Sequence, residues 1–428
     1  MTQILQARKG KITEEMEIVA ELEGVTPEFI RAGVAKGHIV IPKNKYRDRS
    51  QICGIGTGLD VKVNGLMGTS SDRNDMEMEA KKLMMLEECG ANAFMDLSTG
   101  DDIDAMGKQS LSISNIAAGC VPVYQASVEA IEKHGAMVDM TTDDLMETIE
   151  KQCQEGMDFM AIHSALNWDV LNALQRTGRV SDVVSRGGSF LTAWMFHNQK
   201  ENPLFEHFDR LLEILKATDT VLSIGDAIRP GANADSLDAA QITGLMVAGD
   251  LTKRALEAGV QVMIEGPGHV PLNHIATTMQ MQKRLCHGVP YYILGFLATD
   301  VAPGYDNITG AIGGAYAGLH GADFLCYLTP AEHLGLPTEE DVRIGVRTTR
   351  IAADCANVLR RGGPAWNRSL AMSKARVALD KEAQIANALD PETLRAKMAL
   401  EKATDDGCAA CGDEKCLADI AAEYFEIA

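Results

Sequence analysis

Short apolar runs recur between about residues 59 and 329, and amphipathic helical stretches separate them. Runs that are apolar at nearly every position are typical of parallel strands buried on both faces, so their alternation with helices predicts an α/β fold. Nine such runs favour a (β/α)8 TIM-type barrel with one run misassigned, and an open doubly wound sheet is the alternative. The run at 183–188 closely follows its predecessor, so we expect it to be partly loop. The nine runs span 59–64, 92–98, 120–124, 158–164, 183–188, 220–226, 260–266, 290–295 and 323–329.

The segments on either side of these runs have a helical character. Near the N-terminus, Thr26-Pro27 is typical of a helix start and Gly37 of a helix end. Beyond residue 338, long amphipathic stretches predict two or three further helices. We therefore divide the chain into an N-terminal helical region, a catalytic barrel, C-terminal helices and a cysteine-rich tail, at residues 1–58, 59–338, 339–404 and 405–428.

Polar residues lie at the carboxyl ends of nearly all the predicted strands. In a barrel these ends meet on one face, which is where barrel enzymes keep their active sites. One strand that ends in a polar residue means little, but a whole series favours an enzyme. The series comprises Asn64, Asp96 and Ser98, Tyr124, His163, Ser185 with Arg186, Asp226, Glu265 and Thr329, followed in the loops by Arg229, His269 and His333.

The charge balance excludes several classes of partner. Sixty acidic and 40 basic residues give the 428-residue chain a formal charge of −20, which repels nucleic acids and anionic lipid surfaces. No apolar run approaches the ~18 residues of a membrane helix, and the N-terminus lacks the apolar core of a signal peptide. We expect a cytoplasmic protein without nucleic-acid or membrane partners.

Three of the ten cysteines, Cys408, Cys411 and Cys416, lie close together near the C-terminus. Such a cluster in a cytoplasmic protein indicates metal binding rather than disulfides. Structural zinc sites need four ligands, usually as two separate pairs, and no second pair is evident. Three thiolates in one loop therefore favour a [4Fe–4S] cluster with one iron left open. A zinc site completed by a histidine, or three incidental thiols, is the alternative.

Two loops and two histidines suggest further chemistry. The small residues of 185–189 and 225–231 would let backbone N–H groups approach a phosphate, and each loop carries an arginine. A structural Asp226–Arg229 pair is equally compatible with the second loop. His269 and His333 follow different strands and would suit one divalent metal, although two hydrogen-bonded loop histidines are the simpler interpretation.

Together these motifs resemble the radical S-adenosylmethionine enzymes related to phosphomethylpyrimidine synthase of thiamine biosynthesis. The matches follow one another in order along nearly the whole chain, and EGPGHVP together with the cysteine spacing is the most specific of them. They are MDLSTG (95–100), VPVYQ (121–125), IH (162–163), SRGGS (185–189), GDAIRPG (225–231), EGPGHVP (265–271), TDVAPGYD (299–306), CYLTPAEHLGLP (326–337), SKAR (373–376) and Cys-x2-Cys-x4-Cys.

The resemblance implies a barrel whose C-terminal extension carries a [4Fe–4S] cluster into the active site of a partner subunit, and hence a homodimer. It implies aminoimidazole ribonucleotide as substrate, S-adenosylmethionine as co-substrate and an external electron donor. A 5′-deoxyadenosyl radical would take hydrogen from the ribose. His269 and His333 would hold a zinc or iron ion, and Glu265 and Asp226 would be catalytic. The nucleotide would contact Asn64, Met95, Tyr124, His163, Ser185, Gly187, Asp226, Arg229 and Glu265.

The chain departs from the thiamine enzyme beside the predicted substrate loops. The departures are Asn64-Gly-Leu-Met-Gly68 for NANIG, Ala227-Ile228 within GDAIRPG, Phe296 for a proline and Asn307 for a histidine. Such departures suit a cavity reshaped for a different product. The family includes a short paralogue that converts the same ribonucleotide into 5-hydroxybenzimidazole, the precursor of the lower base of anaerobic cobamides. The resemblance therefore implies a radical carbon–carbon lyase of that type. A short phosphomethylpyrimidine synthase is the first alternative. A zinc-dependent barrel hydrolase that uses the two histidines and Glu265 is the second.

Overall fold

The computed structural model of the chain describes residues 1–49, 51–400 and 424. They belong to two compact units, Met1–Arg360 and Arg361–Ala428. Within the described residues, no helix combines the length and the apolar character that crossing a bilayer requires.

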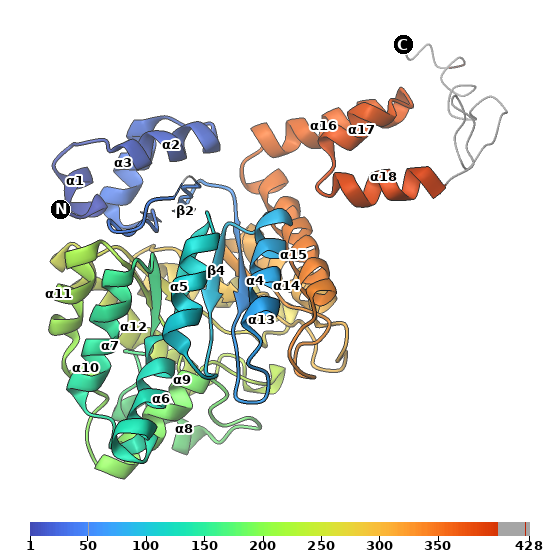
Figure 1. The fold of residues 1–428 in the computed structure, drawn as a ribbon. Coiled ribbons are helices and arrows are strands. Elements are labelled where there is room, and N and C mark those ends of the chain that lie inside the picture. Colours follow the sequence, from blue (N-terminus) through green and yellow to red (C-terminus); the bar gives the residue numbers. More distant parts are fainter. Residues whose placement is uncertain (50, 401–423, 425–428) are drawn as a thin grey trace. The chain divides into compact units, whose positions relative to one another are not determined.

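Eight parallel strands of the first unit close into a barrel in the order β10-β3-β4-β5-β6-β7-β8-β9 (Figure 1). Almost every strand residue is buried, as expected where helices cover the outer face and side chains fill the lumen. The predicted barrel is confirmed over the open sheet. The strands are β3 (Lys62–Met67), β4 (Ala93–Asp96), β5 (Ala117–Cys120), β6 (Phe159–Ile162), β7 (Val221–Ile224), β8 (Val262–Glu265), β9 (Tyr291–Leu294) and β10 (Phe324–Cys326).

The helices of the barrel alternate with its strands. Their ends follow local sequence rules: Thr141 and Asp144 form a capping box at the start of α7, and Gly156 ends that helix in the left-handed conformation. The helices are α4 (Met76–Glu88), α5 (Ile103–Ile113), α6 (Pro122–His134), α7 (Thr142–Glu155), α8 (Trp168–Thr177), α9 (Arg186–Asn198), α10 (Pro203–Glu206), α11 (Phe208–Thr218), α12 (Ala239–Ala258), α13 (Leu272–Leu285), α14 (Asp306–His320) and α15 (Glu339–Arg360).

Three of the nine predicted strands need correction. The run at 183–188 is a loop followed by the first turn of α9, as suspected, because the Ser185 side chain caps that helix. The run at 120–124 contains only the last residue of β5, and Pro122 begins α6, where its missing N–H costs nothing. The run at 59–64 lies three residues too early, since β3 continues through Gly65 to Met67.

The N-terminal part of the first unit contains α1 (Gln3–Arg8), α2 (Glu14–Glu23) and α3 (Pro27–Lys36). Thr26 caps α3 and Gly37 ends it with a φ of +80°, as the sequence predicts. A two-stranded antiparallel sheet of β1 (Ile39–Val40) and β2 (Ile55–Gly56) follows, which the helical pattern did not predict. In the second unit the described helices are α16 (Gly363–Val377), α17 (Lys381–Asn387) and α18 (Pro391–Leu400).

A buried carboxylate joins the N-terminal segment to the amino ends of two barrel strands. Asp158, directly before β6, is fully buried and accepts hydrogen bonds from the backbone N–H groups of Asn44 (2.8 Å) and Ala118 (2.9 Å). It also forms an ion pair of 2.7 Å with Arg47, whose guanidinium donates to the carbonyls of Ser114 and Ile116. Arg49 lies 3.3 Å from the same carboxylate. The partners of this charge come from the N-terminal segment and from β5, so the carboxylate fixes how these two segments lie beside β6.

Removing this carboxylate should strongly destabilise the fold. We expect Asp158→Ala to lower the free energy of unfolding by about 3–5 kcal/mol, because it leaves the Arg47 guanidinium buried without its counter-charge. Urea unfolding followed by circular dichroism measures the loss. Asp209→Ala is the matched control. The Asp209 carboxylate is 85% exposed and forms an ion pair of 2.8 Å with Arg254. Its removal should lower the free energy of unfolding by only about 0–1 kcal/mol. Equal losses in the two variants would contradict the structural role of Asp158.

Candidate active site

A cavity of about 510 Å³ lies within the barrel and is lined by five of the predicted substrate residues. They come from β4, β8, the first turn of α6 and the segments that follow β6 and β7, so the chain brings them together only when the barrel closes. Its apolar walls include Leu66, Leu97 and Leu294. The five predicted residues are Met95, Tyr124, His163, Arg229 and Glu265.

His163 lies between two glycines. A Cβ atom at Gly187 would come within 2.4 Å of the imidazole, and one at Gly225 within 3.0 Å. Burial, and secondarily the positive charge of Arg229, lowers the pKa of His163 to about 3, so the ring is neutral at neutral pH. Its Nδ1 has no hydrogen-bond partner among the described residues. The cavity therefore contains a fixed, neutral imidazole with unused hydrogen-bonding capacity.

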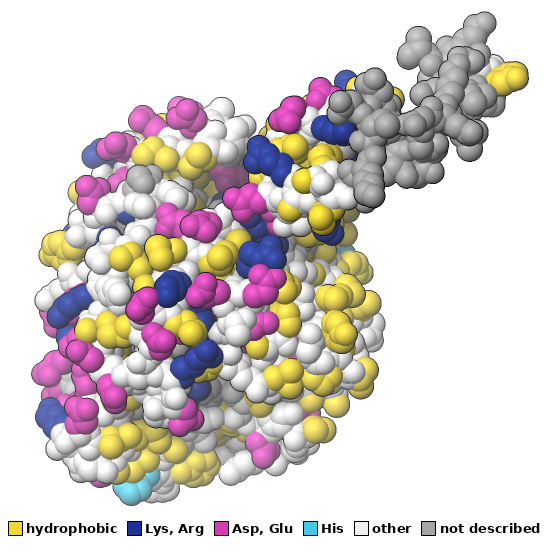
Figure 2. All heavy atoms as spheres, turned by 45° about the vertical axis from the view of Figure 1, so that its right-hand side comes forward, with side chains coloured by type: hydrophobic (Ala, Val, Ile, Leu, Met, Phe, Trp, Pro, Cys, Tyr) yellow, Lys and Arg dark blue, Asp and Glu magenta, His cyan; other side chains and the backbone are white. Residues whose placement is uncertain are grey.

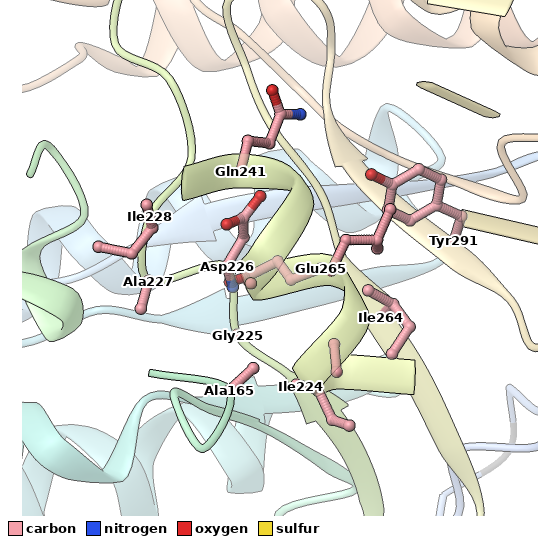
Figure 3. A pocket seen from close by; sticks show the side chains of 13 residues that line it. Ala165, Ile224, Gly225, Asp226, Ala227, Ile228, Gln241, Ile264, Glu265 and Tyr291 are labelled. Carbon is pink, nitrogen blue, oxygen red and sulfur yellow. The ribbon is translucent and has the colours of Figure 1, made fainter. Parts of the chain in front are cut away.

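A second cavity, of about 420 Å³, lies on the α12 side of β7 and β8 and shares Glu265 with the first. Figure 3 shows the Asp226 carboxylate directed toward Gln241, and Glu265 extending toward Asp226. The backbone N–H of Asp226 donates to Glu265 Oε2 at 3.2 Å. Glu265 lines both cavities, so it connects the two sides of the site.

Burial determines the protonation of these two acids. It raises the pKa of Asp226 to about 7; the negative charge of Glu265 acts in the same direction and Arg229 opposes both. Burial also raises the pKa of Glu265, again against the charge of Arg229. Perturbed acids beside a cavity are common in active sites, because the same environment suits proton transfer near neutral pH.

The N-terminus of α9 packs onto this arrangement. The Ser185 hydroxyl accepts from the N–H of Gly188, and a Cβ atom at Gly188 would lie 2.2 Å from the Ala227 carbonyl oxygen. The Arg186 guanidinium lies over the Tyr124 ring, 5.4 Å from its centroid. Glycines therefore let a positive helix end approach the cavity residues, which is the arrangement that binds anions.

Tyr292 is a cavity residue that the sequence analysis missed. It lies on β9, lines the first cavity, and its hydroxyl accepts a 2.8 Å hydrogen bond from Asn64 Nδ2. Asn64 itself is wholly buried within β3. The sequence signal that could have identified Tyr292 is the doublet Tyr291-Tyr292 in a strand. Adjacent strand residues face opposite sides, and here Tyr292 lines the first cavity and Tyr291 the second.

The two predicted metal-binding histidines lie side by side. The ring centroids of His269 and His333 are 5.2 Å apart, at an interplanar angle of 52°. The Nδ1 atoms face carboxylates, Asp300 at 2.8 Å and Asp306 at 3.4 Å. Histidine ligands of metals commonly have this second partner, which orients the ring and leaves Nε2 for the metal.

The two histidines thus fit one divalent ion with part of its coordination open. The described residues contain no group of three or more His, Cys, Asp or Glu side chains that could hold a metal, so within this part of the chain the pair has no third ligand of these types. The sequence analysis used 299–306 only as a matching motif, whereas in the structure its two carboxylates, Asp300 and Asp306, face the histidine pair. Cys408, Cys411 and Cys416 lie outside the described residues.

The departures from the thiamine enzyme lie around these cavities. Leu66 lines the first cavity, and Ala227 and Ile228 line the second. Phe296 is fully buried, in a segment paired with that of His269, and Asn307 follows the Asp306 partner of His333. None of them is a distant surface change.

Comparison with known proteins agrees with this arrangement. The family described as "Radical SAM ThiC family" matches residues 2–423. The chain is 83% identical to "5-hydroxybenzimidazole synthase BzaB" of Eubacterium limosum, over 100% of both chains. It is 61% identical to the protein of that name from Moorella thermoacetica, over 99% of both chains. Its identity to a "Phosphomethylpyrimidine synthase" of Dehalococcoides mccartyi is 51%, over 100% of this chain and 99% of the other. The chain therefore belongs to the Radical SAM ThiC family of enzymes, which use a [4Fe–4S] cluster and S-adenosylmethionine.

Proposed function

We propose that this enzyme converts aminoimidazole ribonucleotide into 5-hydroxybenzimidazole for the lower ligand of anaerobic cobamides. The observation that carries the proposal is the difference in identity, 83% and 61% to two relatives named 5-hydroxybenzimidazole synthase against 51% to phosphomethylpyrimidine synthases. The apolar departures at Leu66, Ala227 and Ile228 support it, since they line the cavities in which a different product would have to be shaped.

Cys408, Cys411 and Cys416 are the ligands that we propose for the [4Fe–4S] cluster. The chemistry that such a cluster supplies, when bound, is the reductive cleavage of S-adenosylmethionine with an electron from an external donor. His269 and His333 would hold a zinc or iron ion, and Asp300 and Asp306 would orient their rings.

The chain's own residues would bind and orient the nucleotide. The N-terminus of α9, with Ser185 and Gly187, and the Arg229 guanidinium offer positive potential and N–H donors to the phosphate. Neutral His163 offers one donor and one acceptor to the ribose hydroxyls without adding charge. The apolar walls keep water from these groups, which strengthens each polar contact.

Asp226 and Glu265 are the proposed acid and base. The backbone contact of 3.2 Å places Glu265 beside Asp226, and burial raises the pKa of both. A carboxyl group whose pKa is about 7 can release or accept a proton at neutral pH, as a rearrangement that redistributes protons on a heterocycle requires.

The proposed homodimer is supported by an apolar stripe on two adjacent helices. Neighbouring residues of the stripe are three or four positions apart on α14 and eight positions apart on α15, so each helix presents them on one face. Every one of these side chains is at least 38% exposed. Figure 2 brings the side of α14 and α15 forward and shows hydrophobic side chains gathered on the right of the barrel unit. Exposed apolar patches of this kind mark protein interfaces. The stripe comprises Ile308, Ile312, Tyr316 and Leu319 of α14 with Ile351 and Leu359 of α15.

The first prediction concerns the product. The anaerobically reconstituted enzyme, given aminoimidazole ribonucleotide, S-adenosylmethionine and dithionite, should form 5-hydroxybenzimidazole, identified by mass spectrometry and fluorescence. Cys411→Ala should form neither this product nor 5′-deoxyadenosine, because the cluster has lost a ligand. A phosphorylated hydroxymethylpyrimidine would assign the enzyme to thiamine synthesis instead. A colourless zinc protein that never cleaves S-adenosylmethionine would favour the hydrolase alternative.

The second prediction concerns stability and pH. The pKa of Asp226 is raised from 3.8 to about 7 on folding, so the folded protein binds the extra proton and the group's contribution to stability is lost as pH rises through 7. The wild type should therefore lose free energy of unfolding relative to Asp226→Asn between about pH 4 and pH 7.5. Denaturant titrations at several pH values measure the difference. A difference that does not change with pH would mean that Asp226 is ionised in the folded protein.

The third prediction concerns assembly. Ile312→Asp should convert a dimer into a monomer in analytical ultracentrifugation, because it puts a charge into the apolar stripe. Leu22→Asp on α2 is the control, because Leu22 is also an exposed apolar residue (69% exposed, against 53% for Ile312) but lies outside the stripe. The Leu22→Asp variant should remain dimeric. If Ile312→Asp sediments as the wild type does, the stripe is not the interface.

A further inference from the structure

The proposed phosphate site has two halves, which two different loops carry. The first loop, residues 178–185, joins α8 to α9 and ends at Ser185, which caps α9. The second loop, residues 225–238, joins β7 to α12 and contains Arg229, which lines the first cavity. One phosphate can accept hydrogen bonds from both halves only if the distance between the two loops is fixed, because these bonds tolerate little variation in length.

The two loops are in direct contact. A Cβ atom at Gly231 of the second loop would lie 2.3 Å from Val184 Cγ1 and 2.9 Å from Ser181 Cβ of the first loop. The buried Asp235 carboxylate of the second loop accepts from the backbone N–H groups of Val180 at 2.9 Å and Ser181 at 3.1 Å. Close packing and two hydrogen bonds therefore hold the loops together at one point.

Arg179 forms a second connection between the same loops. Its side chain is fully buried, and its guanidinium forms a bidentate ion pair with Asp238, with Nε at 2.5 Å from Oδ2 and Nη2 at 2.7 Å from Oδ1. The third nitrogen, Nη1, donates to the carbonyl oxygens of Arg229 and Asp182, both at 3.4 Å. Arg179 thus contacts the backbone from which the Arg229 side chain extends.

Regular structure holds both partners of this ion pair. Asp238 Oδ1 also accepts from the Gln241 N–H at 2.7 Å, so the carboxylate caps the 20-residue helix α12. Helix α12 packs against α8, the helix that ends two residues before Arg179. The ion pair is therefore fixed from both sides, and it can fix the loops in turn.

This connection requires an arginine. A planar guanidinium can bind both oxygens of a carboxylate and still donate to backbone carbonyls, whereas the ammonium group of lysine is a single point of charge. Stability alone does not explain the pair, because apolar residues of similar volume often stabilise a fold as well as a buried ion pair does.

We propose that Arg179 is a positioning residue that joins the two halves of the phosphate site and fixes Arg229 relative to the N-terminus of α9. This inference rests on the proposed function, in which these halves bind the phosphate of the nucleotide. Arg179 does not touch the phosphate itself, because Asp238 and two backbone carbonyls occupy its guanidinium.

Two ligands isolate the contribution of the phosphate. Aminoimidazole ribonucleotide and the corresponding ribonucleoside differ only in this group, so the ratio of their dissociation constants measures what the phosphate site contributes. Titration calorimetry on the anaerobically reconstituted enzyme, without S-adenosylmethionine or reductant, gives both constants and forms no product.

Arg179→Lys keeps the positive charge beside Asp238 but cannot form the bidentate pair. We expect this variant to bind the ribonucleotide about 10- to 100-fold more weakly than the wild type, which is the loss expected for a misplaced charge-assisted hydrogen bond. Its affinity for the ribonucleoside should not change.

Arg360→Lys is the matched control. The Arg360 guanidinium also donates to a backbone carbonyl, that of Ala322 at 2.6 Å, and to a buried aspartate, Asp323 at 3.0 Å, but at the amino ends of the strands. This variant should bind both ligands as the wild type does.

A second pair of variants leaves Arg179 in place. Gly231→Ala should also weaken binding of the ribonucleotide and not of the ribonucleoside, because the added methyl group pushes the two loops apart. Gly107→Ala on α5 is its control, since a Cβ atom there would meet only a methionine methyl group at 3.8 Å. This pair decides the question if Arg179→Lys does not fold, which thermal unfolding would show.

The outcomes separate this proposal from the function on which it rests. If the wild type binds ribonucleotide and ribonucleoside equally well, the two loops do not bind a phosphate, and the positioning role falls together with the proposed phosphate site. If the wild type prefers the ribonucleotide and Arg179→Lys prefers it by the same ratio, the phosphate site stands and the positioning role is overturned. A parallel loss of affinity for both ligands leaves this ratio unchanged, and would show that Arg179 serves only the stability of the fold.

Discussion

The constraint on which the rest of the structure depends is the closure of eight short parallel strands into one barrel. Closure requires the lumen to be filled, and three aromatic rings fill part of it: the centroid of Phe324 lies 6.2 Å from that of Phe159 and 4.5 Å from that of Tyr292. The Tyr292 ring also lines the first cavity, so the packing that closes the barrel forms a wall of the site. Closure alone also brings residues from distant parts of the chain to one end of the strands.

Polar groups at the two ends of the barrel differ in how fully they are paired with opposite charges and hydrogen-bond donors. At the amino ends, Asp158 has two arginines and two backbone N–H groups as partners. Asp323 has Lys283 and Arg360, which hold its pKa below the ordinary value against the effect of burial. At the carboxyl ends, His163 is buried and Asp226 is half-buried, and their pKa values shift toward the neutral forms. Complete pairing serves stability. Incomplete pairing leaves the site groups available to a ligand.

The sequence predicts the barrel and most cavity residues because both depend on local pattern. Near-continuous apolar runs identify most strands, and polar residues after them identify the mouth. The apolar pattern did not identify strand β5, because the residues of this strand are small. A Cβ atom at Gly119 would lie 2.3 Å from the Phe159 ring, so the neighbouring strand determines the choice of glycine. The sequence pattern also missed the end of β3 for a similar reason, since a Cβ atom at Gly65 would lie 2.3 Å from Leu86 of α4. Requirements imposed by a distant partner leave no periodicity to detect. The role of Asp300 likewise depends on a contact between two loops, because its partner His269 follows a different strand.

The apolar walls bear on chemistry as well as on shape. Ala227 and Ile228, at most 4% exposed, line the cavity that Asp226 faces, and burial is the first cause of that residue's raised pKa. A change in these wall residues alters how much water reaches the carboxyl group, and hence its proton affinity, without altering any polar group of the site. Relatives in one family can therefore share their charged residues and still differ in the proton affinity of this carboxyl group. The departures of this chain lie where such a difference would arise, at the apolar walls beside Asp226 and Glu265.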